Sequence, residues 1–281
     1  MYRAETEHEP APSMMHADDK DAVDLFDRNA KWWHDVYAED SLDGAIYRRR
    51  ELLALQWLEG VLGNAAALDA GCGAARVAWQ LAHAAWPVIA FDPSENMLAM
   101  AKAASPLHAS APRFVRANAD AIPLASSSCS PVVALGLLPW LSAPEHVLRE
   151  LRRVTREGGY VLLTSDNRWR LAELVSMDSL LPSGLRHRVR ALAQRFGWRV
   201  TGVYGRRYSQ KQVRTMLLRV GLVPVRETTL GFGPVKVLGF RVLPDAVGRR
   251  LDSLFQRLAD QQRFGLHRLG NHHVVLAEVV A

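Results

Sequence analysis

The stretch that decides the fold is Leu68-Asp69-Ala70-Gly71-Cys72-Gly73-Ala74-Ala75. An apolar run ends in a carboxylate, two glycines follow, and an amphipathic segment begins at Arg76, which is the pattern of a strand, a turn and a helix. Because Gly71 and Gly73 have no Cβ, the turn can be tight and a ligand can approach the backbone closely. Such a turn predicts a ligand site at the carboxyl end of a strand, although a lone G-x-G string occurs in many nucleotide-binding folds.

The order of strand and helix repeats along the next hundred residues. Apolar runs that predict strands begin at Ala66, Val88, Arg113, Pro131 and Tyr160. Amphipathic segments that predict helices lie between them at 76–84, 94–104 and 143–155. This alternation is typical of βαβ units and of a mostly parallel sheet covered on both faces. We therefore predict a doubly wound α/β fold.

The segments that flank this core differ from it in texture. Residues 1–20 are acidic and polar and predict a disordered tail, whereas 21–63 carry apolar residues at helical spacing and predict an N-terminal helical lid. Residues 64–167 then form the expected α/β core. In residues 168–281 we expect substrate-shaping helices at 168–176, 185–196, 209–220 and 246–259, and closing strands at 222–228 and 273–280 that complete the same domain.

Length and composition exclude several classes of protein. The chain has 281 residues, of which 49% are apolar and 23% charged, as in soluble globular proteins. No apolar run reaches the roughly 18 residues of a membrane span, and the N-terminus lacks the apolar core of a signal peptide. Two cysteines cannot form a disulfide framework, which predicts a reducing, cytoplasmic location.

Charge is distributed unevenly along the chain. Residues 1–148 hold 11 basic and 19 acidic residues, and residues 149–281 hold 24 and 10. A basic half favours an acidic partner such as RNA, and the arginine-rich amphipathic segment 185–196 permits peripheral contact with a membrane. However, 30 of the 35 basic residues are arginine, which indicates a compositional habit, and no nucleic-acid motif is present. Nucleic acid is therefore the less favoured partner.

Three further motifs follow the predicted strands. Asp92 ends the second strand, 23 residues after Asp69, where a carboxylate can hold both hydroxyls of a ribose. Asp120 follows the third strand and can accept a hydrogen bond from an exocyclic amine such as that of adenine. The helix stop and turn at 155–159 precedes the fifth strand.

Together these motifs resemble those of the class I S-adenosylmethionine-dependent methyltransferases, and within that class the small-molecule branch called type 11. The resemblance covers residues 68–167 and implies a Rossmann-like methyltransferase fold with S-adenosylmethionine as cofactor. It implies that Asp69, Gly71 and Gly73 border the methionine part, that Asp92 takes the ribose with Pro93 and Met97 near the adenine, that Asp120 and Ala121 contact the adenine edge, and that Leu135 and Gly136 lie under the sulfonium.

The chain departs from the family pattern in two places. Ala75 stands where the family usually has a third glycine, and Cys129-Ser130 stands where it often has Phe-Asp. The N-P-P-[FY] pattern of amide and base amine methylation is absent, and residues 136–141 take its place. This argues against a DNA adenine or protein glutamine methyltransferase.

The acceptor side is less determined by the sequence. Tyr37, Tyr47, Trp140 and Asn167 are candidate substrate residues. The competing role of Tyr37 and Tyr47 is to pack an N-terminal helix pair onto the sheet. Asn167 lies with Asp166 just after the fifth strand, and its competing role is to cap the following helix.

No catalytic or metal-binding residue is assigned from the sequence. Cys72 is expected to pack as a small side chain. His272 and His273 are neighbours on a strand and point to opposite faces, so they cannot serve one site together. We expect a structural role for them, with a general base or a metal ligand as the alternative. The histidines lack metal-ligand spacing, and an activated methyl donor makes a strong catalytic motif unnecessary.

These observations favour a cytoplasmic S-adenosylmethionine-dependent methyltransferase that acts on a small molecule. The apolar, Gly/Pro-rich stretch 230–243 indicates a hydrophobic acceptor, and O-methylation is the first expectation. One alternative is an RNA methyltransferase that uses the basic half. The other is a catalytically inactive partner subunit with a methyltransferase fold, which Ala75 and Ser130 would permit. The oligomeric state is not predicted.

Overall fold

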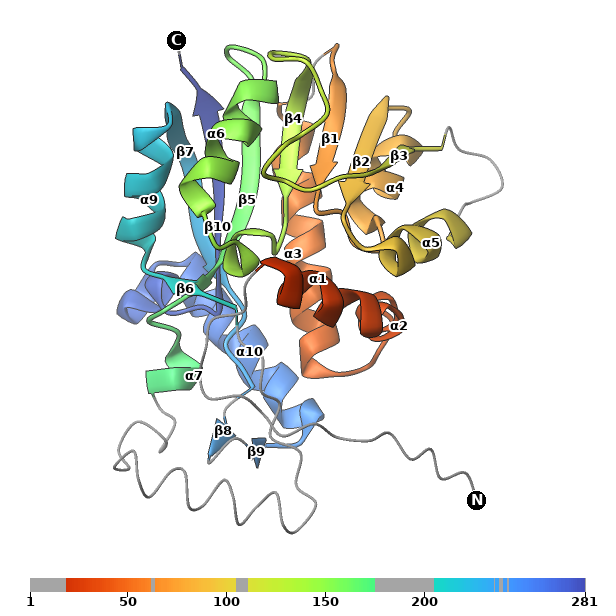
Figure 1. Ribbon diagram of the computed structural model, residues 1–281. Coiled ribbons are helices and arrows are strands. Elements are labelled where there is room, and N and C mark those ends of the chain that lie inside the picture. Colours follow the sequence, from red (N-terminus) through yellow and green to blue (C-terminus); the bar gives the residue numbers. More distant parts are fainter. Residues whose placement is uncertain are drawn as a thin grey trace, which may run out of the picture.

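A twisted β-sheet flanked by helices forms the centre of the molecule in a computed structural model (Figure 1). The structure describes residues 19–61, 64–104, 111–174, 205–234, 236–237, 240–241 and 243–280. In spatial order the main strands are β3 (Arg113–Arg116), β2 (Val88–Asp92), β1 (Ala66–Ala70), β4 (Cys129–Ala134), β5 (Tyr160–Asn167), β10 (His272–Val279) and β7 (Leu222–Leu230). The short β6 (Arg207–Tyr208) pairs with the end of β5, and β8 (Lys236–Val237) pairs with β9 (Phe240–Arg241).

Strand direction divides the sheet into two parts. The five strands from β3 to β5 are parallel, so their carboxyl ends lie at one edge. β10 runs antiparallel to both β5 and β7, with His272 opposite Asp166 and Leu230. The start of β10 therefore meets the edge at which the parallel strands end.

The helices cover both faces of the sheet (Figure 1). Among the described residues, the α-helices before β6 are α1 (Asp19–Arg28), α2 (Ala30–Asp35), α3 (Leu42–Glu59), α4 (Arg76–His83), α5 (Glu95–Ala103), α6 (Pro144–Val154) and α7 (Leu171–Leu174). The later helices are α9 (Gln210–Arg219) and α10 (Asp245–Asp260), and the short 3-10 helices are η1 (Leu138–Trp140) and η3 (Arg263–Arg268). No helix of the described residues combines the length and apolar character that a membrane crossing requires.

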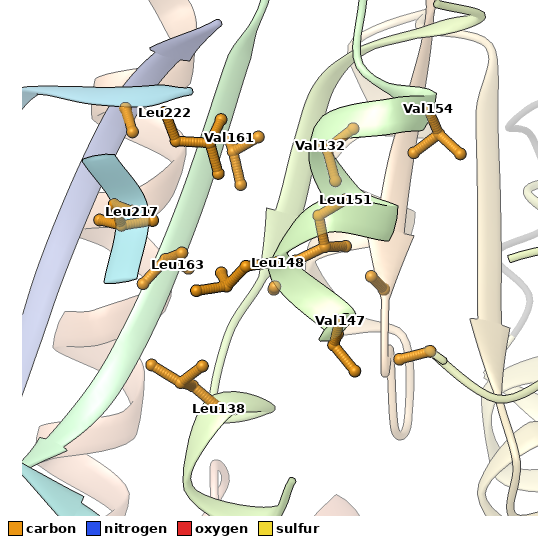
Figure 2. Close-up of a cluster of buried hydrophobic side chains, with 14 of the residues drawn as sticks. Val132, Leu138, Val147, Leu148, Leu151, Val154, Val161, Leu163, Leu217 and Leu222 are labelled. Carbon is orange, nitrogen blue, oxygen red and sulfur yellow. The ribbon is translucent and has the colours of Figure 1, made fainter. Parts of the chain in front are cut away.

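Two apolar layers hold these helices to the sheet. On one face, α6 and α9 bury Leu148, Leu151 and Leu217 against β4 and β5, and Figure 2 shows these side chains between the helices and the strands. On the other face, α3 and α4 bury their apolar side against β1 and β2. Covered on both faces, the parallel strands are almost continuously apolar, as the sequence runs predicted.

Helices α1, α2 and α3 cross the edge at which the parallel strands end (Figure 1). Asp27 of α1 ties this layer to the core, because its Oδ1 accepts hydrogen bonds from Ser94 Oγ (2.6 Å) and from the Asn96 amide (3.0 Å). Ser41 caps α3 by accepting from the Gly44 amide at 3.0 Å. A lid of helices thus lies directly over the edge where open α/β sheets bind ligands.

The predicted fold class is confirmed, and several boundaries move. α1 begins at Asp19, inside the segment expected to be disordered, and residues 1–18 lie outside the described residues. β4 spans Cys129–Ala134 and not 131–137, because Leu135 and Gly136 already belong to the turn that follows the sheet. Of the helix expected at 168–176 the structure describes only α7, and the helix expected at 185–196 lies outside the described residues.

Candidate functional site

A cavity of about 750 Å³ lies between the carboxyl ends of the parallel strands and the helical lid. Its floor comes from the turns after β1, β2 and β4, and its roof comes from α1, α2 and α3. This volume lies in the upper half of the range for small-molecule sites. The cavity is large enough for a nucleoside-sized ligand and a second small molecule.

The turn after β1 exposes backbone to the cavity. Gly71 and Gly73 both have positive φ, +65° and +53°, a conformation that favours glycine. A Cβ on Gly71 would lie 3.1 Å from Leu137 Cδ1. Ala75 also has positive φ, +57°, and is fully buried as the N-cap residue of α4. The alanine at this position therefore takes a conformation that favours glycine, with its methyl group fully buried.

Asp69 lies beneath this turn at the end of β1. Its carboxylate is buried, and its Oδ2 accepts a hydrogen bond from the Ala78 amide at 3.2 Å. Burial raises the pKa of Asp69 to about 7, since one hydrogen bond does not replace the water lost by the charged form. Asp69 ties the end of β1 to the first turn of α4 and lines the cavity floor.

Asp92 joins the turns that follow β1 and β2. Its Oδ2 accepts from the Gly73 amide and its Oδ1 accepts from the Ser94 amide, both at 2.9 Å. Burial raises the pKa of Asp92, and these two hydrogen bonds oppose that shift. A carboxylate has about four acceptor positions, so each oxygen can still accept from a ligand hydroxyl.

Most of the predicted cofactor residues meet at this cavity. Those that line it are Asp69, Gly71, Gly73, Asp92, Pro93, Met97, Asp120, Leu135 and Gly136. Ala121, the exposed residue that follows Asp120, is not among the lining residues. The segments therefore converge as the motif spacing predicted, with Ala121 as the exception.

Of the four candidate substrate residues, three line the cavity. Tyr37, Tyr47 and Trp140 do so, and Asn167 does not. Asn167 is buried at the end of β5, where its Nδ2 donates to the carbonyls of Arg268 and Gly270, both at 2.8 Å. Its Oδ1 accepts from the Trp169 amide. Asn167 thus fixes the loop before β10 and leaves the cavity to its neighbour Asp166.

Arg50 of α3 places a buried guanidinium against the turn after β4. The residue is 8% exposed, and its Nη1 would lie 3.1 Å from a Cβ on Gly136. Nη2 donates to Tyr37 Oη at 2.9 Å, and Cζ lies 4.9 Å from the centre of the Tyr47 ring. Nε is buried without a hydrogen-bond partner among the described residues. A buried cation with an unused donor favours an anionic ligand group in the cavity.

Arg76, the first residue of α4, also lines the cavity and is already paired. Its Nε and Nη2 donate to the two carboxylate oxygens of Glu51, at 2.8 and 3.3 Å. Its Cζ lies 4.6 Å from the centre of the Tyr37 ring. This pair fixes α3 to the start of α4 and positions the Tyr37 ring beside Arg50.

Aromatic side chains form one wall of the cavity between the lid and β10. Phe26 contacts both Trp140 and Trp33, with ring centres 4.9 and 5.1 Å apart. Trp33 contacts Tyr47 at 5.9 Å, and Tyr47 contacts the His272 ring at 6.1 Å. All five residues line the cavity, so a continuous row of rings leads from the end of β4 to the start of β10.

The row of rings ends at a His–Asp pair. His272 Nδ1 lies 3.1 Å from Asp166 Oδ1, and both residues line the cavity. His273 points to the other face of the sheet, as predicted, and is buried with its Nε2 3.0 Å from Glu227 Oε2. The expected structural role fits His273, whereas His272 lies at the cavity.

Cys72 is a partly buried residue in the glycine turn. Burial raises the pKa of the Cys72 thiol well above its ordinary value, so the thiol is protonated at neutral pH. Within the described ranges, no group of three or more His, Cys, Asp or Glu is placed to hold a metal ion.

Several residues at the site escape sequence reasoning. Glu51, Arg76 and Phe26 come from different elements of the chain, and no local pattern marks them as site residues. His272 was considered as a general base only as the alternative to a structural role, and its pairing with Asp166 depends on the complete fold. Arg50 did leave a signal, because it follows Ile46 and precedes Ala54 at helical spacing on the buried side of α3. A charge on the apolar face of a helix is a candidate ligand-binding group.

Comparison with known proteins supports the resemblance found in the sequence. Residues 68–163 match the family model described as a methyltransferase domain. Magnesium protoporphyrin IX methyltransferase from Synechocystis, solved with bound S-adenosylhomocysteine, has 14% identity and a TM-score of 0.60, covering 93% of this chain and 99% of that one. A methyltransferase from Mesorhizobium loti has 19% identity and a TM-score of 0.53, covering 84% and 99%. No curated protein matches the sequence.

One structural neighbour is named for a different reaction. The [4+2]-cyclase SpnF has 16% identity and a TM-score of 0.60, covering 98% of this chain and 100% of that one. At these identities the structural neighbours show the fold alone, and a fold does not fix a reaction. The matching domain model supports a methyltransferase of the class I, type 11-like kind with S-adenosylmethionine as its cofactor. Two neighbours that share the fold were solved with S-adenosylhomocysteine or S-adenosylmethionine bound.

Proposed function

We propose that this chain transfers a methyl group from S-adenosylmethionine to a small, hydrophobic acceptor, and that the acceptor atom is oxygen. The observation that carries the proposal is the single cavity that joins two unlike ends. The cofactor end consists of the glycine turn, Asp69 and Asp92. The acceptor end consists of the aromatic row and the His272–Asp166 pair.

The residues at the cofactor end fit S-adenosylmethionine. Asp92 keeps acceptor positions free for two ribose hydroxyls, and Pro93 and Met97 lie beside it for the adenine. Asp120 and Ala121 lie on the adenine side in this proposal, with Asp120 at the cavity. Arg50, with its unused buried donor, suits the carboxylate of the methionine part.

The cofactor supplies the chemistry when bound, since its positive sulfur makes the attached methyl group reactive toward nucleophiles. The chain supplies position and a dry site. The lid and the aromatic row exclude water, and the turn at Leu135 and Gly136 forms the wall between the two ends. Alignment of donor and acceptor is then the main contribution to rate.

The acceptor class follows from the lining of the acceptor end. Phe26, Trp33, Tyr37, Tyr47 and Trp140 present apolar ring surface, which favours a flat or hydrophobic molecule. The cavity lies between the sheet edge and the lid, and a folded RNA helix has no equivalent route to it. The cavity is therefore stronger evidence for a small acceptor than the basic half of the chain is for an RNA acceptor.

The test is calorimetric titration of S-adenosylhomocysteine into the wild-type chain, Asp92→Ala and Glu95→Ala. Glu95 is the matched control, since it is an exposed carboxylate in the same turn that pairs only with Arg116 among the described residues. Hydrogen bonds to a charged group contribute about 1.5–3 kcal/mol, so Asp92→Ala is expected to lose at least about tenfold in affinity. Equal affinity in all three proteins would contradict the ribose assignment.

The inactive partner subunit is the competing function, since a fold does not fix a reaction and one structural neighbour is a [4+2]-cyclase. The two functions differ in a simple readout. An enzyme transfers labelled methyl groups to an acceptor, whereas an inactive subunit binds cofactor or a partner without transfer.

A further inference from the structure

We propose that His272 is the general base of this reaction and that the acceptor presents a phenolic hydroxyl to it. This inference rests on the proposed methyltransferase function and adds the base and the chemical class of the acceptor. Asp166 is a positioning residue that acts through His272.

The geometry of the pair leaves one nitrogen of His272 available. Asp166 and His272 lie directly opposite each other on β5 and β10. The contact of 3.1 Å between Asp166 Oδ1 and His272 Nδ1 places the ring proton on Nδ1, because a carboxylate can only accept. Nε2, on the other side of the ring, has no hydrogen-bond partner among the described residues. It therefore carries the lone pair of a base, as in other His–Asp pairs.

The charged groups around His272 keep Asp166 ionised. Burial raises the pKa of Asp166, but the hydrogen bond from His272 and the positive charges of Arg170 and Arg207 oppose burial, and the net pKa lies below its ordinary value. Tyr47 and Arg50 face the pair from α3. A fixed negative charge behind the ring stabilises the imidazolium that forms when Nε2 accepts a proton.

The lining of the cavity selects the acceptor class. The row from Trp140 through Phe26, Trp33 and Tyr47 ends at the His272 ring, so an aromatic acceptor that packs along it brings its edge to His272. Aromatic rings gain from such offset and edge contacts. A phenolic hydroxyl has a pKa of about 10 and needs a base at neutral pH, whereas a carboxylate acceptor would need none.

The step balances as follows. The O–H bond of the acceptor breaks, and its proton passes to His272 Nε2. The electron pair left on oxygen forms the new bond to the methyl carbon, while the pair of the breaking carbon–sulfur bond stays on sulfur. The products are a methyl ether, a neutral thioether and protonated His272, which then returns its proton to solvent.

The first test measures the protonation state of His272 in the wild-type chain and uses a variant to assign its signals. Nitrogen-15 NMR of the labelled wild-type chain at neutral pH reports which nitrogen of each imidazole carries the proton, and loss of one signal set in His272→Gln assigns His272. The expected result is a neutral ring protonated on Nδ1 alone. A ring protonated on Nε2, or on both nitrogens, would overturn the proposal. In Asp166→Asn we expect the population of the Nδ1-protonated form to fall.

The second test separates His272 from the cofactor. S-adenosylhomocysteine affinity is expected to remain within about threefold in His272→Gln and in the exposed control His83→Gln, a small difference on the scale where 1.4 kcal/mol is tenfold. A loss above about tenfold in His272→Gln alone would overturn the assignment to the acceptor. Failure of the wild-type chain to bind S-adenosylhomocysteine would overturn the proposed function itself, whatever the NMR result.

The third test uses acceptor acidity. Labelled methyl transfer is measured to 4-methylphenol and to 4-nitrophenol. At pH of about 8, where 4-nitrophenol is mostly ionised and 4-methylphenol is not, we expect His272→Gln to lower the rate with 4-methylphenol about 100-fold or more and to change the rate with 4-nitrophenol much less, because an ionised oxygen needs no base. Equal losses with both phenols would overturn the role of base. Transfer to neither phenol by a wild-type chain that binds S-adenosylhomocysteine would overturn the phenolic class.

Discussion

The two ends of the cavity are built in different ways. The cofactor end comes mostly from consecutive turns of the core, and much of it is backbone, as in the amides of Gly73 and Ser94 that Asp92 holds. The acceptor end comes from side chains on α1, α2, α3, η1, β5 and β10. Asp166 and His272, which are in contact, are 106 residues apart in the sequence. A short motif can encode the first kind of site, and only the complete fold assembles the second.

The largest expected effect concerns the cofactor end and its buried carboxylate. The pKa of Asp69 is raised from 3.8 to about 7, so the folded state binds its proton more tightly than the unfolded chain does. This contribution to stability is complete below pH of about 4 and is lost as pH rises through about 7. Asparagine does not ionise, so Asp69→Asn keeps its stability as pH rises. Above pH 7 this variant should be more stable than wild type, by up to about 4 kcal/mol.

Urea unfolding from acid to mildly alkaline pH measures this difference. The control is Glu95→Gln, which removes an exposed carboxylate and leaves the buried floor of the cavity unchanged. A free-energy difference between Asp69→Asn and wild type that does not change with pH would show that Asp69 is not held in a costly buried state.

The next effect distinguishes the two ends by their charge. If Arg50 holds the methionine carboxylate, Arg50→Met should weaken S-adenosylhomocysteine binding by about 1.5–3 kcal/mol, which is roughly 10- to 100-fold. The control is Arg219→Met, whose ion pair with Glu145 is exposed. Calorimetry of both variants measures the effect, and unchanged affinity in Arg50→Met would assign the arginine to the acceptor end.

Replacement of the glycines in the turn gives a smaller effect. Gly71→Ala and Gly73→Ala both force alanine to adopt positive φ, at a cost of about 1 kcal/mol. Only Gly71→Ala also pushes a methyl group to 3.1 Å from Leu137, whereas the nearest atom at Gly73 is Met97 Sδ at 3.9 Å. We expect thermal unfolding to show a larger loss of stability for Gly71→Ala, and equal losses would contradict this packing.

The smallest effect concerns the departure at Ala75. Ala75→Gly relieves the positive φ of +57° but removes a fully buried methyl group, and both contributions are about 1 kcal/mol. The two nearly cancel, so stability and S-adenosylhomocysteine affinity should stay close to wild type. A tenfold gain in affinity would instead show that Ala75 weakens the cofactor end, as the inactive-subunit hypothesis requires.

The same contrast explains what the sequence could predict. The parallel core was predicted, and nine of the ten residues predicted to bind the cofactor line the cavity, because strand periodicity and the glycine turn are local patterns. At the acceptor end, Tyr37, Tyr47 and Trp140 were anticipated as lid and strand-end aromatics. Asp166 and Asn167 were both expected at the ligand-binding edge, but Asn167 was chosen as the substrate candidate and Asp166 is the one that lines the cavity. Alternation along β5 decides which side chain meets the cavity, and the exact strand end is not a local property. His272 required the antiparallel pairing of β10 with β5, which no motif marks.

The most direct test of the central claim is a crystal structure of the chain with S-adenosylhomocysteine. The account predicts density across the glycine turn, with the ribose hydroxyls on Asp92, the carboxylate on Arg50 and the sulfur facing the aromatic row and His272. Density for S-adenosylhomocysteine in another place, or none in this cavity at saturating concentration, would contradict it.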